Sequence, residues 1–395
     1  MQNQEHQAFI KNYIFNFLVS FFVYFAMYLL IVVIAQYAIQ RYDVSTGVAG
    51  LITGIFIVGA LIGRFVGGRY IHEVGPKRLL IIGLVLFIIT QCFYFIEGSL
   101  IFLFVTRFLN GMALAIATTA TGTIVPLIAP VERRGVAISL FSLSLVIGAA
   151  IGPFLGLYLA GIYPTFVLFT VCLIVAILAF IFALFLKVNV KMADQQSDHQ
   201  GFHISQFISV PAIPIALVVL ICGLGYASVL SFLQLYAVEI NLTAVARYYF
   251  IFYAITSVFT RPFVGRILDR FHENWVAYPA LVIFSVGILI LAIAHSGWAL
   301  LLSGALVGIG YGSMTAVGNV VAVKVSRADQ VGLATSTFFI GLDVGVGFGP
   351  ALLGMILPAI GYRMMYVAIG IILLLCIILY AFIHGRRQPK VMQYL

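Results

Sequence analysis

The chain has 395 residues, of which 63% are hydrophobic and only 8% are charged, and its formal net charge is +9. A soluble protein carries about 25% charged residues, so this composition excludes a water-soluble globule and indicates that lipid surrounds most of the chain. The positive charge does not indicate nucleic acid as a partner, because Lys and Arg lie in short segments between apolar runs and form no basic stripe.

Twelve apolar runs approach or exceed the roughly 20 residues that a helix needs to cross a bilayer. In chain order they cover residues 14–39, 46–68, 79–96, 100–128, 136–160, 164–186, 211–237, 245–267, 276–294, 298–323, 333–358 and 363–384. A polar stretch from Lys187 to Phe207 interrupts the series near its middle. We therefore predict an all-α integral membrane protein with a six-helix bundle over residues 1–186, a cytoplasmic linker over 187–210 and a second six-helix bundle over 211–395.

The placement of the basic residues predicts the orientation of the chain. With both termini in the cytoplasm, 15 of the 21 Lys and Arg residues fall in inner segments and three fall in outer loops. Cytoplasmic loops are enriched in Lys and Arg, so we predict a multi-pass protein of the cell (plasma) membrane with both termini cytoplasmic. The remaining three are Arg64, Arg107 and Arg261. We interpret Arg64 and Arg261 as helix-end residues whose side chains reach toward the membrane surface.

The two halves are similar in sequence at a constant offset of 197 residues. Arg64 then aligns with Arg261, and Gly68 with Gly265. The same offset aligns Gly135, Ala137, Ser139 and Phe141 with Gly332, Ala334, Ser336 and Phe338, and Gly148, Gly152 and Pro153 with Gly345, Gly349 and Pro350. An internal repeat of whole bundles is typical of transporters, with the substrate site between the halves. It predicts two pseudo-symmetric bundles around a central cavity.

Three sequence motifs stand out, one in a loop between predicted helices and two within predicted helices. The loop after the second run reads Gly68-Arg-Tyr-Ile-His72-Glu73-Val-Gly75-Pro-Lys77-Arg78, and its second-half copy reads Arg261-Pro-Phe-Val-Gly265-Arg-Ile-Leu-Asp269-Arg270. The fourth run contains Arg107, Asn110 and Gly111, and the fifth contains Gly148-x-x-x-Gly152-Pro153-x-x-Gly156. Glycines four residues apart let helices approach closely, and proline bends a helix.

Together these motifs resemble the major facilitator superfamily and, within it, the twelve-helix drug:proton antiporter group. The resemblance implies that the loop motif is a charge-linked latch that holds one conformation, and that Arg107 takes part in coupling. It also associates the motif of the fifth run with antiport and therefore with export. His72 stands where the family has an Asp, and the adjacent Glu73 is a carboxylate that could replace it.

Asp343 is the only one of the 12 acidic residues that lies deep in a predicted span. A carboxylate in hydrocarbon costs a few kcal/mol unless it is paired, solvated or protonated. Asp343 and Arg107 are therefore candidates for proton coupling, and the alternative for each is a structural interaction with a neighbouring helix. The resemblance places the first, fourth, seventh and tenth helices around the cavity. Their polar and aromatic residues give the cavity candidates Asn16, Ser20, Tyr24, Asn110, Thr118, Tyr226, Gln234, Tyr311, Thr315 and Asn319. Interhelical hydrogen bonding is the alternative for each of them.

We therefore predict a secondary active transporter that exports a small amphipathic or drug-like molecule, neutral or mildly cationic, by proton antiport with alternating access. Its partners are this substrate, protons and the lipid bilayer, and a monomer is expected to be functional. The alternatives are export of a specific metabolite such as a metallophore or sugar, lipid flipping, and a non-transporting membrane receptor or enzyme. No P-loop, zinc spacing or cluster of His, Cys, Asp and Ser indicates a cofactor, a metal or an enzyme.

Overall fold

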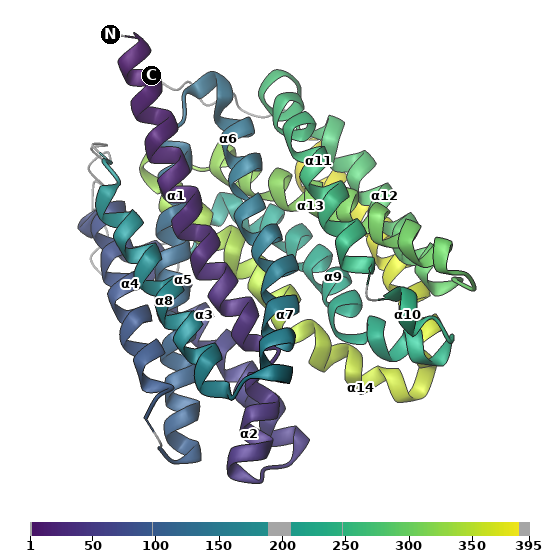
Figure 1. The fold of residues 1–395 in the computed structure, drawn as a ribbon. Coiled ribbons are helices and arrows are strands. Elements are labelled where there is room, and N and C mark those ends of the chain that lie inside the picture. The colour runs from purple at the N-terminus through teal and green to yellow at the C-terminus, as the bar shows by residue number, and fades with distance from the viewer. Residues whose placement is uncertain (1, 97, 189–206, 247, 387–395) are drawn as a thin grey trace. The chain divides into compact units, whose positions relative to one another are not determined.

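The computed structural model describes residues 2–96, 98–188, 207–246 and 248–386, and within these ranges the regular structure is helical, without strands (Figure 1). Helices are expected here, because in lipid every backbone N–H and C=O must be satisfied within the chain. Most of the predicted linker, residues 189–206, lies outside the described residues.

The helices of the first half lie over the predicted runs, although the first helix begins at Gln2, well before the predicted residue 14. They are α1 (Gln2–Ile31), α2 (Ile34–Tyr42), α3 (Thr46–Val74), α4 (Pro76–Phe93), α5 (Leu100–Ile128), α6 (Arg134–Phe141), α7 (Leu143–Ile162) and α8 (Thr165–Phe185). Local sequence sets several ends, since the side chains of Ser45 and Ser99 accept the N–H groups of Val48 and Phe102 and so cap α3 and α5. Gly75 separates α3 from α4 with a φ of 87°, a value that favours glycine.

The second half contains α9 (Ile213–Glu239), α10 (Thr243–Ala246), α11 (Tyr249–Arg270), α12 (Asn274–Ala292), α13 (Gly297–Val325) and α14 (Val331–Tyr380), followed by a π-helical turn at Ala381–Gly385. Among the described residues, ten helical segments are long and apolar enough to cross a membrane. One of these, α14, contains two predicted runs, which meet at Gly361 with its φ of 74°. The polar α11 is not among the ten, but it covers the predicted run 245–267 from Tyr249 onward.

Two predicted runs are interrupted rather than continuous. The first breaks at Val32 and Val33, between α1 and α2, without a proline. Adjacent β-branched residues restrict side-chain rotamers, which makes this a weak point in the helix. The fifth run breaks at Ser142, between α6 and α7, where the Ser142 hydroxyl donates to the carbonyl of Ser139 at 2.6 Å. Competition of this kind between side chain and backbone loosens a helix locally.

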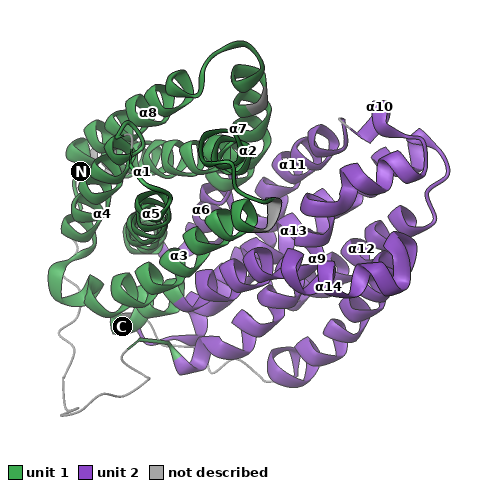
Figure 2. Cartoon of the chain, turned by 90° about the horizontal axis from the view of Figure 1, so that it is seen from below, with its two compact units in different colours: residues 1–130, 144–209, 328–336 green, residues 131–143, 210–327, 337–395 purple. Residues whose placement is uncertain are grey.

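The helices form two compact units (Figure 2). Unit 1 contains Met1–Pro130, Ser144–Ser209 and Ala328–Ser336, and unit 2 contains Val131–Leu143, Val210–Arg327 and Thr337–Leu395. In unit 1, α5 packs against α1, α3 and α4, and in unit 2, α13 packs against α9, α11 and α12. Each unit thus takes most of one half of the sequence and a short segment of the other. The short segments, 131–143 and 328–336, precede the glycine-rich stretches of α7 and α14.

Large apolar side chains remain exposed on the outer faces of the helices, as a lipid-facing surface requires. Examples are Phe154, Phe166 and Phe259, which are 72%, 63% and 71% exposed. The two tryptophans are also exposed and begin successive helices, Trp275 in α12 and Trp298 in α13. Since these helices follow one another across the membrane, the tryptophans are expected at opposite membrane–water boundaries, where this residue is enriched.

Candidate functional site

The polar residues of unit 1 are satisfied mainly by neighbouring helices. On α1, Asn16 donates from Nδ2 to the carbonyl of Thr121 at 2.9 Å, and the Ser20 and Ser144 hydroxyls lie 2.8 Å apart. Tyr24 is buried on the same helix. The two hydrogen bonds join α1 to α5 and α7, so the predicted cavity residues Asn16 and Ser20 also have a packing role.

Arg107, on α5, is buried and stacks over the ring of Phe56 at 4.4 Å. Its Nε donates to the carbonyl of Ile52 and its Nη1 to the hydroxyl of Tyr94, both at 3.4 Å. Among the described residues no carboxylate pairs with it. One turn further along α5, Asn110 donates to the hydroxyl of Thr90 at 2.9 Å.

The two repeat arginines are buried inside the units, so the interpretation that they reach toward the membrane surface is wrong. Arg64 and Arg261 are each 1% exposed, because α3 and α11 continue past them to Val74 and Arg270. The Nη1 of Arg64 donates to the carbonyl of Ala115 at 3.0 Å and lies 2.6 and 3.1 Å from the hydroxyls of Thr118 and Thr119. Arg261 donates from Nη2 to the Thr315 hydroxyl at 3.2 Å, and its Nε and Nη1 have no acceptor in the described part of the chain.

The glycine–proline motif of α7 packs directly against α1. A Cβ at Gly152 would lie 2.7 Å from the Tyr28 Cβ, and the nearest α1 atoms would lie 3.2 Å from a Cβ at Gly148 and 2.6 Å from one at Gly156. The same kind of glycine contact occurs in unit 2, where α14 packs against α9 through Gly341, Gly345 and Gly349. Pro153 and Pro350 follow these contacts inside their helices. Glycine therefore permits both close helix pairs, as the spacing predicts.

Asp343 is half-buried on α14. Gly341 and Gly345, two residues to either side, lie against Ala216 and Leu220 of α9. At 100° per residue, the Asp343 side chain points away from this contact.

The second-half loop motif holds the start of α6. The Asp269 carboxylate accepts the backbone N–H groups of Gly135 and Val136 at 2.5 and 3.0 Å. A carboxylate at a helix N-terminus satisfies unpaired N–H groups and the positive end of the helix dipole. Gly265 lets α11 approach Val136 closely, and the neighbouring Arg270 is exposed.

The first-half motif makes the corresponding helix contact without a carboxylate. Gly68 lies against Ser336, and the Ser336 hydroxyl donates to the carbonyl of Arg64 at 2.6 Å, as Ser139 does to that of Arg261 at 3.0 Å. The imidazole nitrogens of His72 have no hydrogen-bond partner among the described residues. Glu73 does not replace the missing Asp, because it pairs with Arg69 one turn earlier and is half exposed. Lys77 donates to the carbonyl of Leu184, and Arg78 is exposed.

In unit 2, three tyrosines from three helices form a stacked group, which we call the tyrosine cluster. Its members are Tyr226 of α9, Tyr253 of α11 and Tyr311 of α13, and all three are buried. Tyr226 stacks on Tyr311 with ring centroids 4.4 Å apart and on Tyr253 at 5.3 Å. The structure thus brings the predicted residues Tyr226, Tyr311 and Thr315 together with Arg261. Gln234 is exposed further along α9, and Asn319 is buried on α13.

Sequence reasoning missed a buried ionic cluster around Glu273, which is 4% exposed just before α12. The Glu273 carboxylate lies 2.8 Å from Nε2 of His384 and 3.6 Å from Nζ of Lys324. Burial alone would raise the pKa of Glu273, but the His384 hydrogen bond and the Lys324 and His272 charges outweigh it and lower the pKa to about 2. Because His384 is 111 residues away, no local pattern marks this cluster.

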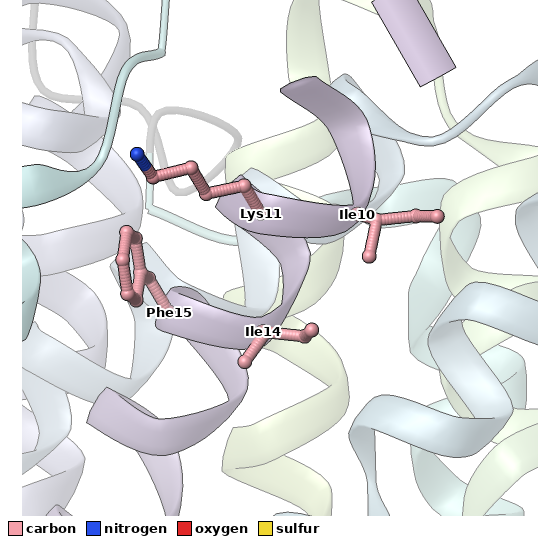
Figure 3. Close-up of a pocket in the computed structure, with 4 residues that line it drawn as sticks. All are labelled: Ile10, Lys11, Ile14 and Phe15. Atoms are coloured by element: carbon pink, nitrogen blue, oxygen red, sulfur yellow. The ribbon is translucent and has the colours of Figure 1, made fainter. Parts of the chain in front are cut away.

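A surface hollow of about 320 Å³ lies along α1, beside Ile10, Lys11, Ile14 and Phe15 (Figure 3). All four residues come from one helix, and the Lys11 ammonium lies 5.8 Å from the Phe15 ring centroid. The hollow lacks the converging polar groups of a specific ligand site. Among the described residues, no group of three His, Cys, Asp or Glu side chains is placed to hold a metal ion.

Comparisons with known proteins agree with this architecture. The family model of the Major Facilitator Superfamily matches residues 17–276 and 245–393. Multidrug resistance protein 1 of Bacillus subtilis is 25% identical over 83% of this chain and 85% of its own. The staphylopine export protein of Staphylococcus aureus is 24% identical over 84% and 86%. The crystal structure of the E. coli fucose:proton symporter has a TM-score of 0.74 at 18% identity and covers 95% of this chain and 99% of its own. The predicted all-α membrane fold of two six-helix halves is confirmed.

Proposed function

Because the chain belongs to the major facilitator superfamily, we propose that it is a secondary active transporter of the cell membrane that exports a small amphipathic or drug-like molecule by proton antiport. The observation that carries the direction of transport is the similarity to two proteins named for drug resistance and export, each over more than four fifths of both chains. The contact of Gly148 and Gly152 with α1 supports it, because the family associates the motif that contains them with antiport.

Alternating access requires helices that pack closely and still move. The glycine contacts of α7 with α1 and of α14 with α9 provide close packing with little side-chain interlocking. We place the halves at residues 1–186 and 211–395 with a cytoplasmic linker at 187–210, both termini in the cytoplasm, and a monomer as the working unit. The Asp269 bond to α6 is the latch that stabilises one of the two conformations.

Asp343 is the proposed proton carrier, and Arg107 the second coupling residue. Asp343 lies away from the α9 contact, and Arg107 is a buried cation for which the described residues supply no carboxylate. A proton drives transport only if its affinity differs between the two open states, which requires a carboxylate whose surroundings change.

Proteoliposomes test the proposal. A proton gradient should drive accumulation of a lipophilic fluorescent dye by the wild type, and Asp343→Asn should abolish this accumulation while leaving downhill exchange intact. Asn keeps the size of the protonated side chain, so packing should survive, but its amide has no titratable proton to carry. Gradient-driven uptake with the wild-type pH dependence in Asp343→Asn would remove Asp343 from the mechanism, and a gradient without effect on the wild type would exclude proton antiport.

Export of a specific metabolite is the second candidate function. The relative named as a staphylopine exporter favours it, since its similarity to this chain is nearly equal to that of the multidrug resistance protein. Competition assays separate the two candidates: many unrelated compounds should inhibit a drug exporter, whereas one compound class should inhibit a metabolite exporter.

A further inference from the structure

Two polar stripes face each other between α11 and α13 in unit 2. Residues four apart lie on one face of a helix. The stripe of α11 consists of Tyr253, Ser257 and Arg261, and that of α13 of Tyr311, Thr315 and Asn319; all six side chains are buried. The Arg261–Thr315 hydrogen bond joins them, and Gly312 brings the α13 backbone against Ser257.

Arg261 is a buried cation that the protein satisfies only in part. Its Nη2 donates to Thr315, while Nε and Nη1 have no acceptor among the described residues, and no described carboxylate forms an ion pair with it. One turn earlier, the buried Ser257 hydroxyl likewise lacks a partner. An unpaired buried charge is strongly unfavourable, so a hydrogen-bond acceptor beside Arg261 and Ser257 would be stabilising. An anionic acceptor would stabilise them most, because it also neutralises the guanidinium charge.

The repeat supplies an internal comparison. Arg64 occupies the equivalent position in unit 1, and the carbonyl of Ala115 and the hydroxyls of Thr118 and Thr119 surround its Nη1. An arginine at this position can therefore be satisfied by the neighbouring helix. In unit 2 the residue equivalent to Ala115 is Gly312, and Arg261 donates to one hydroxyl, that of Thr315, where Arg64 has three acceptors.

The other stripe positions also differ between the halves. Tyr253, Ser257, Tyr311 and Asn319 correspond at the offset of 197 to Phe56, Ala60, Leu114 and Gly122. The second half has polar side chains where the first has apolar ones or none. Packing alone does not require this change, because unit 1 builds the same helix pair with apolar residues.

We propose that Arg261 and Ser257 bind a carboxylate of the exported molecule, and that the tyrosine cluster contacts its apolar part. The inference rests on the proposed function and narrows it to amphipathic molecules with an acidic group, in place of the neutral or cationic ones that the sequence favours. Nε and Nη1 of the guanidinium have no acceptor within the described ranges, and each forms a planar fork for a carboxylate together with Nη2, which has a second N–H besides the one donated to Thr315. The Ser257 hydroxyl adds a further donor. Aromatic rings beside the fork favour a flat apolar neighbour to the acidic group.

Calorimetric titration of the purified full-length protein with 1-naphthoate, 1-naphthamide and 1-naphthylmethylamine tests this assignment. These probes share one ring system and are anionic, neutral and cationic. The wild type should bind 1-naphthoate at least about tenfold more tightly than 1-naphthamide, because charge-assisted hydrogen bonds contribute that much or more. Arg261→Gln should abolish the preference. Arg261→Lys should keep part of it, because Lys retains the charge without the fork.

Arg64→Gln is the matched control. It should keep the preference for 1-naphthoate and lower the thermal midpoint, because it removes satisfied hydrogen bonds. Arg261→Gln should leave the midpoint unchanged or raise it, because it removes an unpaired buried charge. If the thermal midpoint falls as far in Arg261→Gln as in Arg64→Gln, Arg261 is a structural residue. If the wild type binds 1-naphthoate no more tightly than the other two probes, the inference is overturned.

Transport of the same probes separates this inference from the proposed function. A wild type that exports the neutral or cationic probe but not 1-naphthoate keeps the export function and refutes the acidic substrate. A wild type that binds 1-naphthoate preferentially, yet moves none of the probes against a gradient, keeps the site and refutes export.

Discussion

Replacing Asp269 by Asn should loosen the start of α6 about 30-fold. The carboxylate accepts two backbone N–H groups, from Gly135 and Val136, at the N-terminus of this helix. A hydrogen bond to a charged group contributes about 1.5–3 kcal/mol, and Asn retains one neutral acceptor worth about 1 kcal/mol. Because Asp269 is only half-buried, we take the loss as about 2 kcal/mol. At about 1.4 kcal/mol per tenfold, this corresponds to a roughly 30-fold increase in local opening.

Hydrogen–deuterium exchange of the purified protein measures this opening. Peptides covering residues 131–143 should exchange faster in Asp269→Asn, whereas Glu73→Gln should leave every helix start unchanged, because Glu73 pairs only with the nearby Arg69 at the surface. His72→Asp should slow exchange at the start of α14, since it places a carboxylate at the equivalent contact. Unchanged exchange over residues 131–143 in Asp269→Asn would show that the carboxylate does not hold α6.

Three further outcomes are expected. Gly152→Leu should impair transport while membrane insertion stays largely intact, because even a Cβ at this position comes too close to α1. Gly161→Ala is the control and should be neutral, because a Cβ at Gly161, on the same helix, would have nothing within 4 Å. If Gly152→Leu lowers the amount of folded protein as much as it lowers transport, the motif serves packing alone. Because the pKa of Glu273 is lowered on folding, the ionised carboxylate stabilises the folded state by at most about 3 kcal/mol; this stabilisation is complete above pH 4.5 and is lost as the pH falls toward 2. The thermal midpoint of the wild type should therefore fall more steeply below pH 5 than that of Glu273→Gln. Parallel curves of midpoint against pH would contradict this. Labelling of intact cells from outside should reach a cysteine placed at Asp43 and miss one placed at Ser197, a position outside the described residues; labelling of the latter would refute the proposed topology.

Much of the fold follows from local sequence. A long apolar run in lipid must be helical, because no water satisfies the backbone, so the composition and the lengths of the runs determine the class of fold and the approximate helix ends. The glycines at i and i+4 likewise predict close packing, since the missing side chains are a local property. The shared glycine and proline spacing likewise relates α7 to α14, and each of them packs its glycines against one helix, α1 and α9 respectively.

The contacts of individual polar side chains were decided by tertiary structure. Arg64 and Arg261 are equivalent in the sequence repeat, but the first is surrounded by three acceptors of α5 and the second meets one hydroxyl of α13. Glu273 bonds to His384, which is 111 residues away in the sequence. Glu73 pairs with Arg69 on its own helix and does not bond to a helix N-terminus. Hydropathy and spacing fix where a helix runs and which residues share a face, because these depend on the chain itself. The partner of a buried charge depends on which helix packs against that face, and only the assembled bundle supplies it.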